Sequence, residues 1–388
     1  MSGISYLTHL ACPECGSNVP ADQIQTFCPS CISPWLAKYD LAAVRQVLDR
    51  DLMQSRPKGM WRWAELLPVR EPANRITLGE GDTPLLKLER LGAQLGLENL
   101  YLKEEGVNPT GSFKARGLAA AVAKAKESGI HKVIIPTAGN AGGALAAYAA
   151  RAGMQACVVM PEDTPRANRI ESEMAGAEVI QVQGNISDAA KIVAQRAQNE
   201  GWFDVSTFKE PYRLEGKKVM GYELAEVFTW RLPDVIIYPT GGGTGLVGMA
   251  KAFDELEALG WLENSQRPRL VSVQASGCAP VVRAFETGAV DCEFWEEAHT
   301  VASGLRVPKS FAGRLILRDI RRTSGTALSV ADELILKAQR NLAQVEGVFA
   351  APEGAATLAA VELLHERGWI AAQEHIVCFN TGMGLKYI

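Results

Sequence analysis

A lysine directly follows an aromatic residue at the predicted start of a helix, in the segment NPTGSFKARG that spans residues 108–117. The positive end of the helix dipole disfavours a cation at this place. Three roles for Lys114 therefore remain open: an ordinary surface residue, a residue that holds a phosphate, or an amine that chemistry needs in its neutral form. A neutral lysine is a nucleophile toward carbonyl compounds.

A glycine-rich loop, PTGGGTG, lies at residues 239–245 between the apolar run DVIIY and a predicted helix. Its glycines allow consecutive backbone N–H groups to converge, and the start of the following helix adds positive potential. The loop lacks the Gly-Lys-Ser/Thr ending of a Walker A motif and is not a full G-x-G-x-x-G fingerprint. We interpret it as a phosphate-binding loop, with a tight strand-to-helix turn as the alternative.

Two further loops end predicted strands. PTAGNAGG, at residues 136–143, offers the hydroxyl of Thr137, the flexible backbone of Gly139 and the amide of Asn140 at a helix N-terminus, where main-chain N–H groups could grip a carboxylate. Ordinary N-cap chemistry is the alternative. NTGMG follows the run HIVCF and puts Thr381 where α/β proteins bind ligands. Its hydroxyl either faces the cleft or belongs to a simple turn.

Other catalytic constellations are poorly represented. The chain has five histidines, no G-x-S-x-G elbow and no H-E-x-x-H helix motif, so an enzyme of this kind would take its reactivity from a cofactor. The three loops and the helix-start lysine together favour pyridoxal phosphate, whose aldehyde would form a Schiff base with Lys114. The helix dipole and a dry cleft would lower the pKa of this lysine, as imine chemistry requires.

Four cysteines near the N-terminus follow the spacing Cys-x2-Cys, twelve residues, Cys-x2-Cys. This is close to the spacing of a zinc ribbon, and so short a module has too little core to fold unaided. The pattern predicts a structural Zn²⁺ bound by Cys12, Cys15, Cys28 and Cys31, with four reduced thiols as the alternative. The other cysteines are scattered and expected to be buried thiols, which points to a reducing cytosol.

The elements that must position these residues alternate between apolar, strand-like runs and helical stretches from residue 78 onward. KVIIP, QACVVMP, DVIIYPT, LVSVQA and HIVCFN are strand candidates, and helical stretches such as SFKARGLAAAVAKAKESG separate them. This alternation predicts an α/β fold with parallel sheets covered by helices on both faces. Because the chain is longer than one typical domain, we expect two lobes with the site between them.

Composition narrows the range of partners. The 388 residues are 47% hydrophobic and carry a formal charge of −4, which argues against binding to nucleic acid or to an anionic membrane surface. No apolar run is long enough to span a membrane, and the N-terminus lacks the features of a secretory signal. We therefore expect a cytoplasmic protein that acts on a small molecule.

The motifs resemble those of the fold type II, or β-family, pyridoxal-phosphate enzymes, and within that family those of the threonine synthases. NPTGSFKARG, TAGN, GGGTG and the C-terminal threonine occur in the family's order. The resemblance implies that Lys114 is the Schiff-base lysine and moves the α-proton, that Asn140 bonds the 3′-oxygen of the cofactor, and that Thr381 lies beside the pyridine nitrogen. The cofactor phosphate would lie on the loop formed by Gly241, Gly242, Gly243, Thr244 and Gly245.

The same resemblance implies a two-lobed fold in which each lobe is a three-layer αβα sandwich around a parallel sheet. We expect a zinc-ribbon-like segment at residues 1–38. A large cofactor-binding domain would be formed by residues 39–110 and 206–388, with a small domain, residues 111–205, inserted into it. Members of the family are often dimers, so a homodimer is expected.

The substrate is implied by PYRLEGKKVMGYE, which resembles the threonine-synthase segment whose arginine meets the substrate phosphate; here this would be Arg213. The implied reaction converts O-phosphohomoserine and water to L-threonine and phosphate. Lys114 would remove the α-proton, the γ-phosphate would leave, and water would add at the β-carbon. The substrate carboxylate would lie on the amides around Thr137, Ala138 and Gly139.

The chain departs from the family pattern near the site. Ala115 stands where the family often has Asp, and Ala138 and Ala141 stand where hydroxyl residues are usual. The substrate-phosphate pocket thus loses hydroxyl donors, for which Lys209 could compensate. Two alternatives are therefore kept. One is another lyase or β-replacement enzyme of this fold, such as a serine/threonine ammonia-lyase or a cysteate synthase that uses O-phosphoserine; the other is a catalytically silent protein that binds partners through its zinc ribbon.

Overall fold

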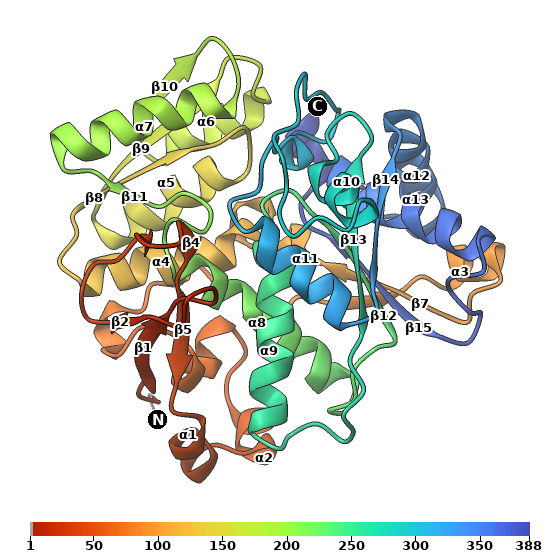
Figure 1. The fold of residues 1–388 in the computed structure, drawn as a ribbon. Helices are drawn as coiled ribbons and strands as arrows, with labels where there is room; N and C mark the ends of the chain where they lie inside the picture. Colours follow the sequence, from red (N-terminus) through yellow and green to blue (C-terminus); the bar gives the residue numbers. More distant parts are fainter. Residues whose placement is uncertain (1–2) are drawn as a thin grey trace.

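The body of the molecule contains two β-sheets with helices packed around them, as the computed structural model, which describes residues 3–388, shows in Figure 1. The larger sheet has the strand order β14-β13-β12-β15-β7-β6. Its neighbours are parallel except at one edge, where β6 runs antiparallel to β7. The strands are β6 (Leu85–Lys87), β7 (Asn99–Glu104), β12 (Val235–Pro239), β13 (Arg269–Ala275), β14 (Thr326–Val330) and β15 (His375–Asn380).

The smaller sheet, at the upper left of Figure 1, is fully parallel with the order β10-β9-β8-β11. Helices α5 and α7 pack against β8 and β9. The strands are β8 (Lys132–Pro136), β9 (Gln155–Pro161), β10 (Glu178–Val182) and β11 (Phe203–Asp204). The predicted α/β class with parallel sheets is therefore confirmed, and the antiparallel edge strand β6 is an addition that the sequence pattern did not predict.

Helices connect the parallel strands and cover the sheets. Their bounds are α1 (Leu41–Val47), α2 (Arg50–Ser55), α3 (Glu89–Leu95), α4 (Lys114–Glu127), α5 (Ala141–Ala152), α6 (Arg166–Met174), α7 (Ile186–Glu200), α8 (Arg213–Val227), α9 (Thr244–Ala258), α10 (Pro280–Glu286), α11 (Gly313–Arg322), α12 (Asp332–Glu346) and α13 (Pro352–Glu366). Three of them begin at predicted site segments: α4 at the lysine, α5 after the asparagine turn and α9 in the glycine loop. The chain ends in a short 3-10 turn, Gly384–Tyr387.

Helix α8 packs against α4 and α9, and nearly all of it is buried although its sequence is strongly charged. The buried charges are paired. The ammonium of Lys218 lies 2.7 Å from Glu215 and 3.0 Å from Glu255, and Arg116 of α4 lies 2.6 Å from Glu223 of α8. Since an unpaired charge in the interior is costly, these pairs make the burial of α8 possible and join it to the first turn of α4.

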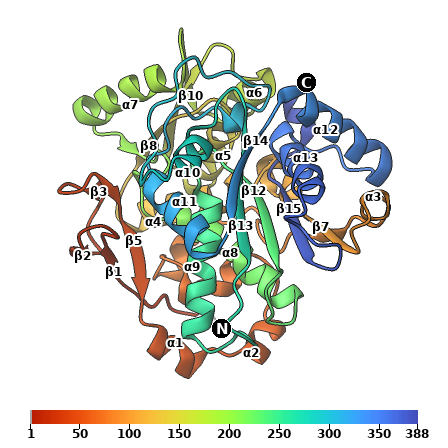
Figure 2. The ribbon, with the colours of Figure 1, turned by 45° about the vertical axis from the view of Figure 1, so that its right-hand side comes forward.

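The N-terminal segment forms a small antiparallel sheet, β2-β1-β5, and a separate β3-β4 ribbon. In Figures 1 and 2 it lies at the edge of the molecule, on the side away from α12 and α13. Tyr212, next to the start of α8, packs into its apolar core and donates a hydrogen bond to the carbonyl of Ala21 at 3.1 Å. The strands are β1 (Leu7–Ala11), β2 (Asn18–Pro20), β3 (Phe27–Cys28), β4 (Ser33–Pro34) and β5 (Leu36–Tyr39).

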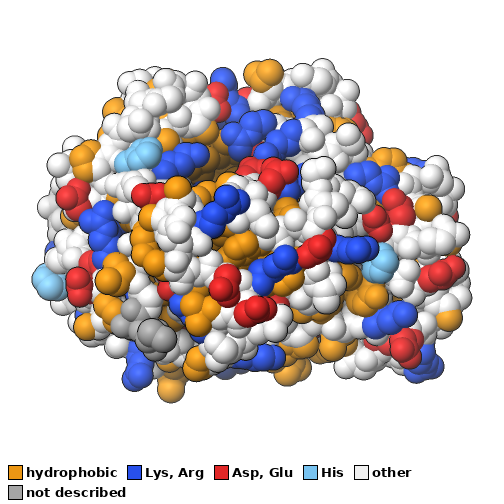
Figure 3. All heavy atoms as spheres, turned by 90° about the horizontal axis from the view of Figure 1, so that it is seen from below, with side chains coloured by type: hydrophobic (Ala, Val, Ile, Leu, Met, Phe, Trp, Pro, Cys, Tyr) orange, Lys and Arg blue, Asp and Glu red, His pale blue; other side chains and the backbone are white. Residues whose placement is uncertain are grey.

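The surface carries both signs of charge. On the face seen in Figure 3, acidic and basic side chains are interspersed with hydrophobic ones, in keeping with a formal charge of −4. Within residues 3–388, no helix combines the length and the apolar character needed to cross a membrane.

Candidate active site

The predicted site segments meet at one cavity of about 270 Å³. Its walls include the carboxyl ends of β8, β12 and β15, which is where open α/β sheets bind ligands. Every residue that the sequence suggested for cofactor or substrate binding lines it: Lys114, Thr137, Ala138, Gly139, Asn140, Lys209, Arg213, Gly241, Gly242, Gly243, Thr244, Gly245 and Thr381. The fold thus brings together five segments that are separated in the sequence.

Lys114 is the first residue of α4 and borders the cavity. The segment before it is tied to the loop after β15, because the amide of Phe113 donates to the carbonyl of Thr381 at 3.1 Å. Burial, and then the nearby Arg213 guanidinium, lower the pKa of Lys114 to about 7, whereas Glu353 acts in the opposite direction. A substantial fraction of this lysine is therefore a neutral amine near pH 7.

The glycine loop joins β12 to α9, which begins at Thr244. Gly243 has a φ of +80°, a left-handed conformation that favours glycine. A Cβ on Gly242 would lie 2.7 Å from Cγ2 of Thr207, and a Cβ on Gly243 would collide with Ile316. Because side chains are excluded here, the backbone N–H groups at the start of α9 stay open to an anionic group in the cavity.

The side chain of Asn140 makes no capping hydrogen bond to α5, so the N-cap alternative does not describe it. Its Nδ2 donates to the hydroxyl of Tyr387 at 3.1 Å, and its buried Oδ1 has no partner among the described residues. In the same turn, the amide of Gly139 donates to Oγ1 of Thr137 at 3.1 Å. Asn140 therefore keeps hydrogen-bonding capacity for a ligand in the cavity.

Most of the charged residues that line the cavity are basic. Its charged lining residues are Lys114, Lys209, Arg213, Arg306, Lys309 and Glu353. Arg213 is 1% exposed, donates to the carbonyl of Val205 at 2.8 Å, and has no partner for its Nε within residues 3–388. Burial lowers its pKa to about 10. A buried guanidinium with donors to spare suits a phosphate or a carboxylate ligand.

Comparison with known proteins decides the family. The family model described as "Pyridoxal-phosphate dependent enzyme" matches residues 76–382. The chain belongs to this family. Within it, the threonine synthase of Methanosarcina acetivorans is 36% identical over 380 residues, which cover 97% of this chain and 92% of that protein. The threonine synthase of Bacillus sp. (strain ULM1) is 38% identical over 331 residues, which cover 85% of this chain and 90% of that protein.

A solved structure extends the comparison to the fold. The processed form of threonine deaminase isoform 2 from Solanum lycopersicum superimposes with a TM-score of 0.66 at 20% sequence identity, covering 94% of each chain. At this identity the match speaks for the fold alone. It confirms the predicted fold type II architecture of the pyridoxal-phosphate-dependent family.

Two residues that line the cavity, Glu353 and Tyr387, were not predicted from the sequence. Glu353 is 4% exposed; its Oε1 accepts a hydrogen bond from the amide of Gly304 at 2.6 Å, its Oε2 has no partner in the described part of the chain, and burial raises its pKa. Tyr387 is the second-last residue and bonds Asn140. Glu353 follows Pro352 at the start of α13, where an acidic residue looks like ordinary helix-dipole compensation, so no sequence signal singled it out.

A further wall of the cavity, residues 303–311, was also not predicted. Its Ser310 donates to the carbonyl of Gly242 in the glycine loop at 3.2 Å. Its Phe311 packs edge-to-face on Phe27 of β3, with ring centroids 5.6 Å apart. The N-terminal segment therefore contacts a wall of the cavity, through a residue beside one of its cysteines.

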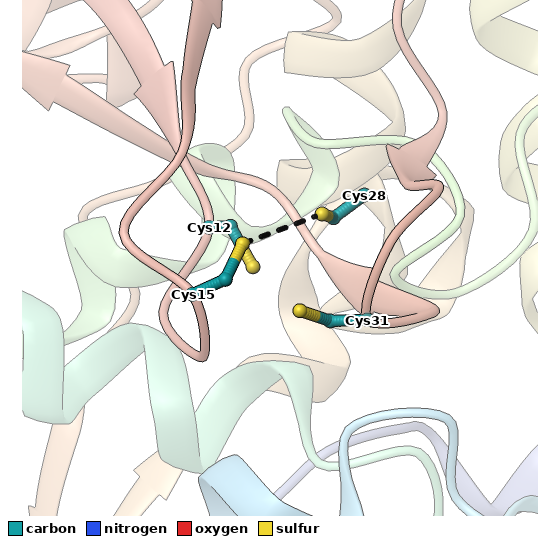
Figure 4. A group of neighbouring side chains, drawn as sticks. All are labelled: Cys12, Cys15, Cys28 and Cys31. Atoms are coloured by element: carbon teal, nitrogen blue, oxygen red, sulfur yellow. Dashed lines mark hydrogen bonds between the residues drawn. The ribbon is translucent and has the colours of Figure 1, made fainter.

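The four N-terminal cysteines form a cluster in the structure, and Figure 4 shows their sulfurs turned toward one another. All four sulfurs lie within 4.8 Å of each other, and the Sγ atoms of Cys15 and Cys28 are 3.8 Å apart. Tetrahedral zinc with Zn–S bonds of about 2.3 Å would hold its sulfurs about 3.8 Å apart, so the donor set fits this metal. The remaining cysteines, Cys157, Cys278, Cys292 and Cys378, are buried and free, as predicted.

Proposed function

We propose that this chain is a threonine synthase, which converts O-phosphohomoserine and water to L-threonine and phosphate. The observation that carries the proposal is the presence of two anion-binding groups in one cavity: the glycine loop and the buried Arg213. One would hold the phosphate of the cofactor and the other the phosphate of the substrate. The two curated relatives, which are 36% and 38% identical, carry the name threonine synthase.

The lining residues fit pyridoxal phosphate. When bound, this cofactor stabilises negative charge at the α-carbon of an amino acid. Lys114, whose pKa is lowered to about 7, would hold the cofactor through its aldehyde and would be the base that takes the α-proton. The N–H groups of residues 241–245 would hold the phosphate. Asn140 uses one amide hydrogen for Tyr387 and would donate the other to the 3′-oxygen of the cofactor, and Thr381, which lines the same cavity, would be the hydroxyl residue for the ring nitrogen.

The substrate occupies the remaining part of the cavity. The amides around Thr137, Ala138 and Gly139, at the start of α5, bind its carboxylate. Arg213 and Lys209 bind its γ-phosphate and stabilise the charge of this group as it leaves. In this chain, cationic side chains would thus bind the substrate phosphate where the family pattern has hydroxyl donors.

Of the three alanines that depart from the family pattern, two line the cavity and one does not. Ala115 is fully buried in the core and is not among the lining residues, so its identity bears little on substrate binding. Ala138 and Ala141 do line the cavity and offer only methyl groups to a ligand. These two positions are where we expect this chain to bind its substrate differently from its relatives.

A parallel assay tests the assignment. Purified protein with bound cofactor is incubated separately with O-phosphohomoserine, threonine and O-phosphoserine, and phosphate, ammonia, 2-oxo acids and threonine are measured. We expect phosphate and threonine from O-phosphohomoserine. Conversion of threonine to 2-oxobutyrate without activity on O-phosphohomoserine would identify an ammonia-lyase instead, and replacement chemistry on O-phosphoserine alone would identify a β-replacement enzyme.

The cysteine cluster is proposed to bind a structural zinc ion through Cys12, Cys15, Cys28 and Cys31. The distances between the sulfurs and the small core of the N-terminal segment support this role. Metal analysis of the purified protein should find about one zinc per chain. Zinc-free protein with an intact N-terminal fold would refute the assignment.

The proposal also includes a cytoplasmic homodimer. The cysteines are all free in the described structure, as expected for a reducing compartment. Light scattering should give the mass of two chains. The mass of one chain would remove the dimer from the proposal without affecting the reaction.

A further inference from the structure

Lys217 of α8 is a buried lysine that has no carboxylate partner within residues 3–388. It is 1% exposed, and burial, Lys114 and Arg213 all lower its pKa well below the ordinary value, with no acidic group offsetting them. The adjacent Lys218 is equally buried but pairs with Glu215 at 2.7 Å. The same helix thus pairs one buried lysine with a carboxylate and leaves its neighbour with a lowered pKa, so that Lys217 carries a charge only when an anion binds nearby.

The contacts of Lys217 lead to the glycine loop. Its Nζ donates a hydrogen bond to Oγ1 of Thr244 at 2.8 Å and lies 4.3 Å from the centre of the Phe113 ring. Room for it is made by Gly117 of α4, where a Cβ would lie 2.8 Å from Cε of Lys217. Lys217 does not line the cavity, whereas Thr244 does. The lysine therefore contacts the glycine loop from the side that faces away from the cavity.

This arrangement sets the direction of the threonine hydroxyl. Because Oγ1 of Thr244 accepts a hydrogen bond from Lys217, its own hydrogen is free to be donated into the cavity, where the start of α9 already favours an anion. We propose that Lys217 is a positioning residue for the phosphate of the cofactor, which orients Thr244 and supplies the positive charge that the glycine loop lacks. The inference rests on the proposed function, in which this loop holds that phosphate.

The affinity for the cofactor phosphate should depend on pH, because the pKa of Lys217 is lowered in the cofactor-free protein. A phosphate dianion near Lys217 raises the pKa of this lysine above its value in the cofactor-free protein. The contribution of Lys217 to phosphate affinity is therefore complete below the lower, cofactor-free pKa and is lost as the pH rises through the higher, cofactor-bound one. Pyridoxal, which has the aldehyde but no phosphate, should lack this contribution.

The test compares pyridoxal phosphate and pyridoxal as ligands of the full chain freed of cofactor, followed by their visible absorbance. Lys217→Gln should weaken pyridoxal phosphate roughly 10-fold to 100-fold, as for the loss of a charge-assisted hydrogen bond, and leave pyridoxal unchanged. Thr244→Val should have a similar effect, and the double variant should be little worse than either single one. Arg306→Gln, which removes a different cation of the cavity that is already paired with Asp163, should keep the ratio of the two affinities.

A ratio of affinities that is unchanged in Lys217→Gln, with both ligands still binding, would overturn the inference and leave the proposed function standing. If that variant does not fold, the pH dependence of the two affinities of the wild type tests the role of Lys217 instead. The preference of the wild type for pyridoxal phosphate over pyridoxal should fall as the pH rises beyond the range in which the phosphate, with a second pKa of about 6, becomes a dianion. A constant preference would contradict the role of Lys217. Failure of the wild type to bind either ligand would overturn the proposed function itself.

Discussion

The amines of Lys114 and Lys217 lie over the same aromatic ring, 4.1 Å and 4.3 Å from the centre of Phe113. One amine borders the cavity and the other lies behind the glycine loop. A charge on Lys114 disfavours a charge on Lys217. The pKa of each lysine is lowered in this chain, and a phosphate near Lys217 would restore the charge on that lysine while Lys114 stays available as a neutral amine.

The first prediction concerns the pH dependence of cofactor attachment. Because only the neutral amine attacks an aldehyde, the rate of attachment to Lys114 should rise with pH around a midpoint near its pKa of about 7. Arg213→Gln should move the midpoint to higher pH, and Glu353→Gln to lower pH, since these two groups shift the pKa in opposite directions. Stopped-flow absorbance measures the rate. A midpoint near 10, the value of an ordinary lysine, would contradict the lowered pKa.

The second prediction concerns the substrate phosphate. Arg213→Gln removes a buried guanidinium and should raise the KM for O-phosphohomoserine roughly 10-fold to 100-fold, as expected for losing hydrogen bonds to a charged group. Arg306→Gln is the matched control, because Arg306 also lines the cavity but pairs with Asp163 at 2.7 Å. Its effect on KM should be smaller. Equal effects of the two variants would argue against a specific role of Arg213.

The third prediction concerns the glycine loop. Gly243→Ala should abolish tight binding of pyridoxal phosphate, because the added Cβ would collide with Ile316 and displace the start of α9. Gly288→Ala is the control, since Gly288 has a similar φ of +71° but nothing within 4 Å of the added Cβ. The control should lose only about 1 kcal/mol of stability and keep the cofactor. Cofactor retention by Gly243→Ala would show that the loop tolerates a side chain.

The fourth prediction concerns the metal. Cys28→Ser should lower the zinc content and the Tm by roughly 5 °C or more, because metal binding and folding of the small N-terminal core are coupled. Cofactor affinity should fall as well, since Phe27 packs on Phe311 in the wall of the cavity. Cys157→Ser, at a buried cysteine far along the chain, should leave the zinc content unchanged. Normal zinc content in Cys28→Ser would remove this residue from the metal site.

The sequence indicated the cavity well where residue type and strand position act together. Lys114, Asn140 and the glycine loop each follow or face the end of a predicted strand, and the parallel sheets bring such ends together whatever the details of packing. The cysteine spacing likewise predicted a cluster that the structure contains. Local patterns were sufficient for these features because turns and helix starts have short sequence signals.

The remaining features depend on packing between distant segments. Tyr387 bonds Asn140 across 247 positions of the chain, and no local pattern indicates that contact. Lys217 looks like half of a charged pair on a helix, and only the burial of α8 distinguishes it from the neutralised Lys218. The contact between Phe27 and Phe311 joins the N-terminal segment to the cavity wall. Such relationships require the assembled core, since they are made by side chains from elements far apart in sequence.

The most direct test of the account follows the oxygen atoms of the reaction. Holoenzyme is incubated with O-phosphohomoserine in water enriched in oxygen-18, and the products are analysed by mass spectrometry. The account predicts one solvent oxygen in the hydroxyl group of threonine and none in the released phosphate, because the phosphate leaves with its bridging oxygen and water adds at the β-carbon. Solvent oxygen in the phosphate, with homoserine as the other product, would mean simple phosphate hydrolysis and would contradict the assignment as a threonine synthase.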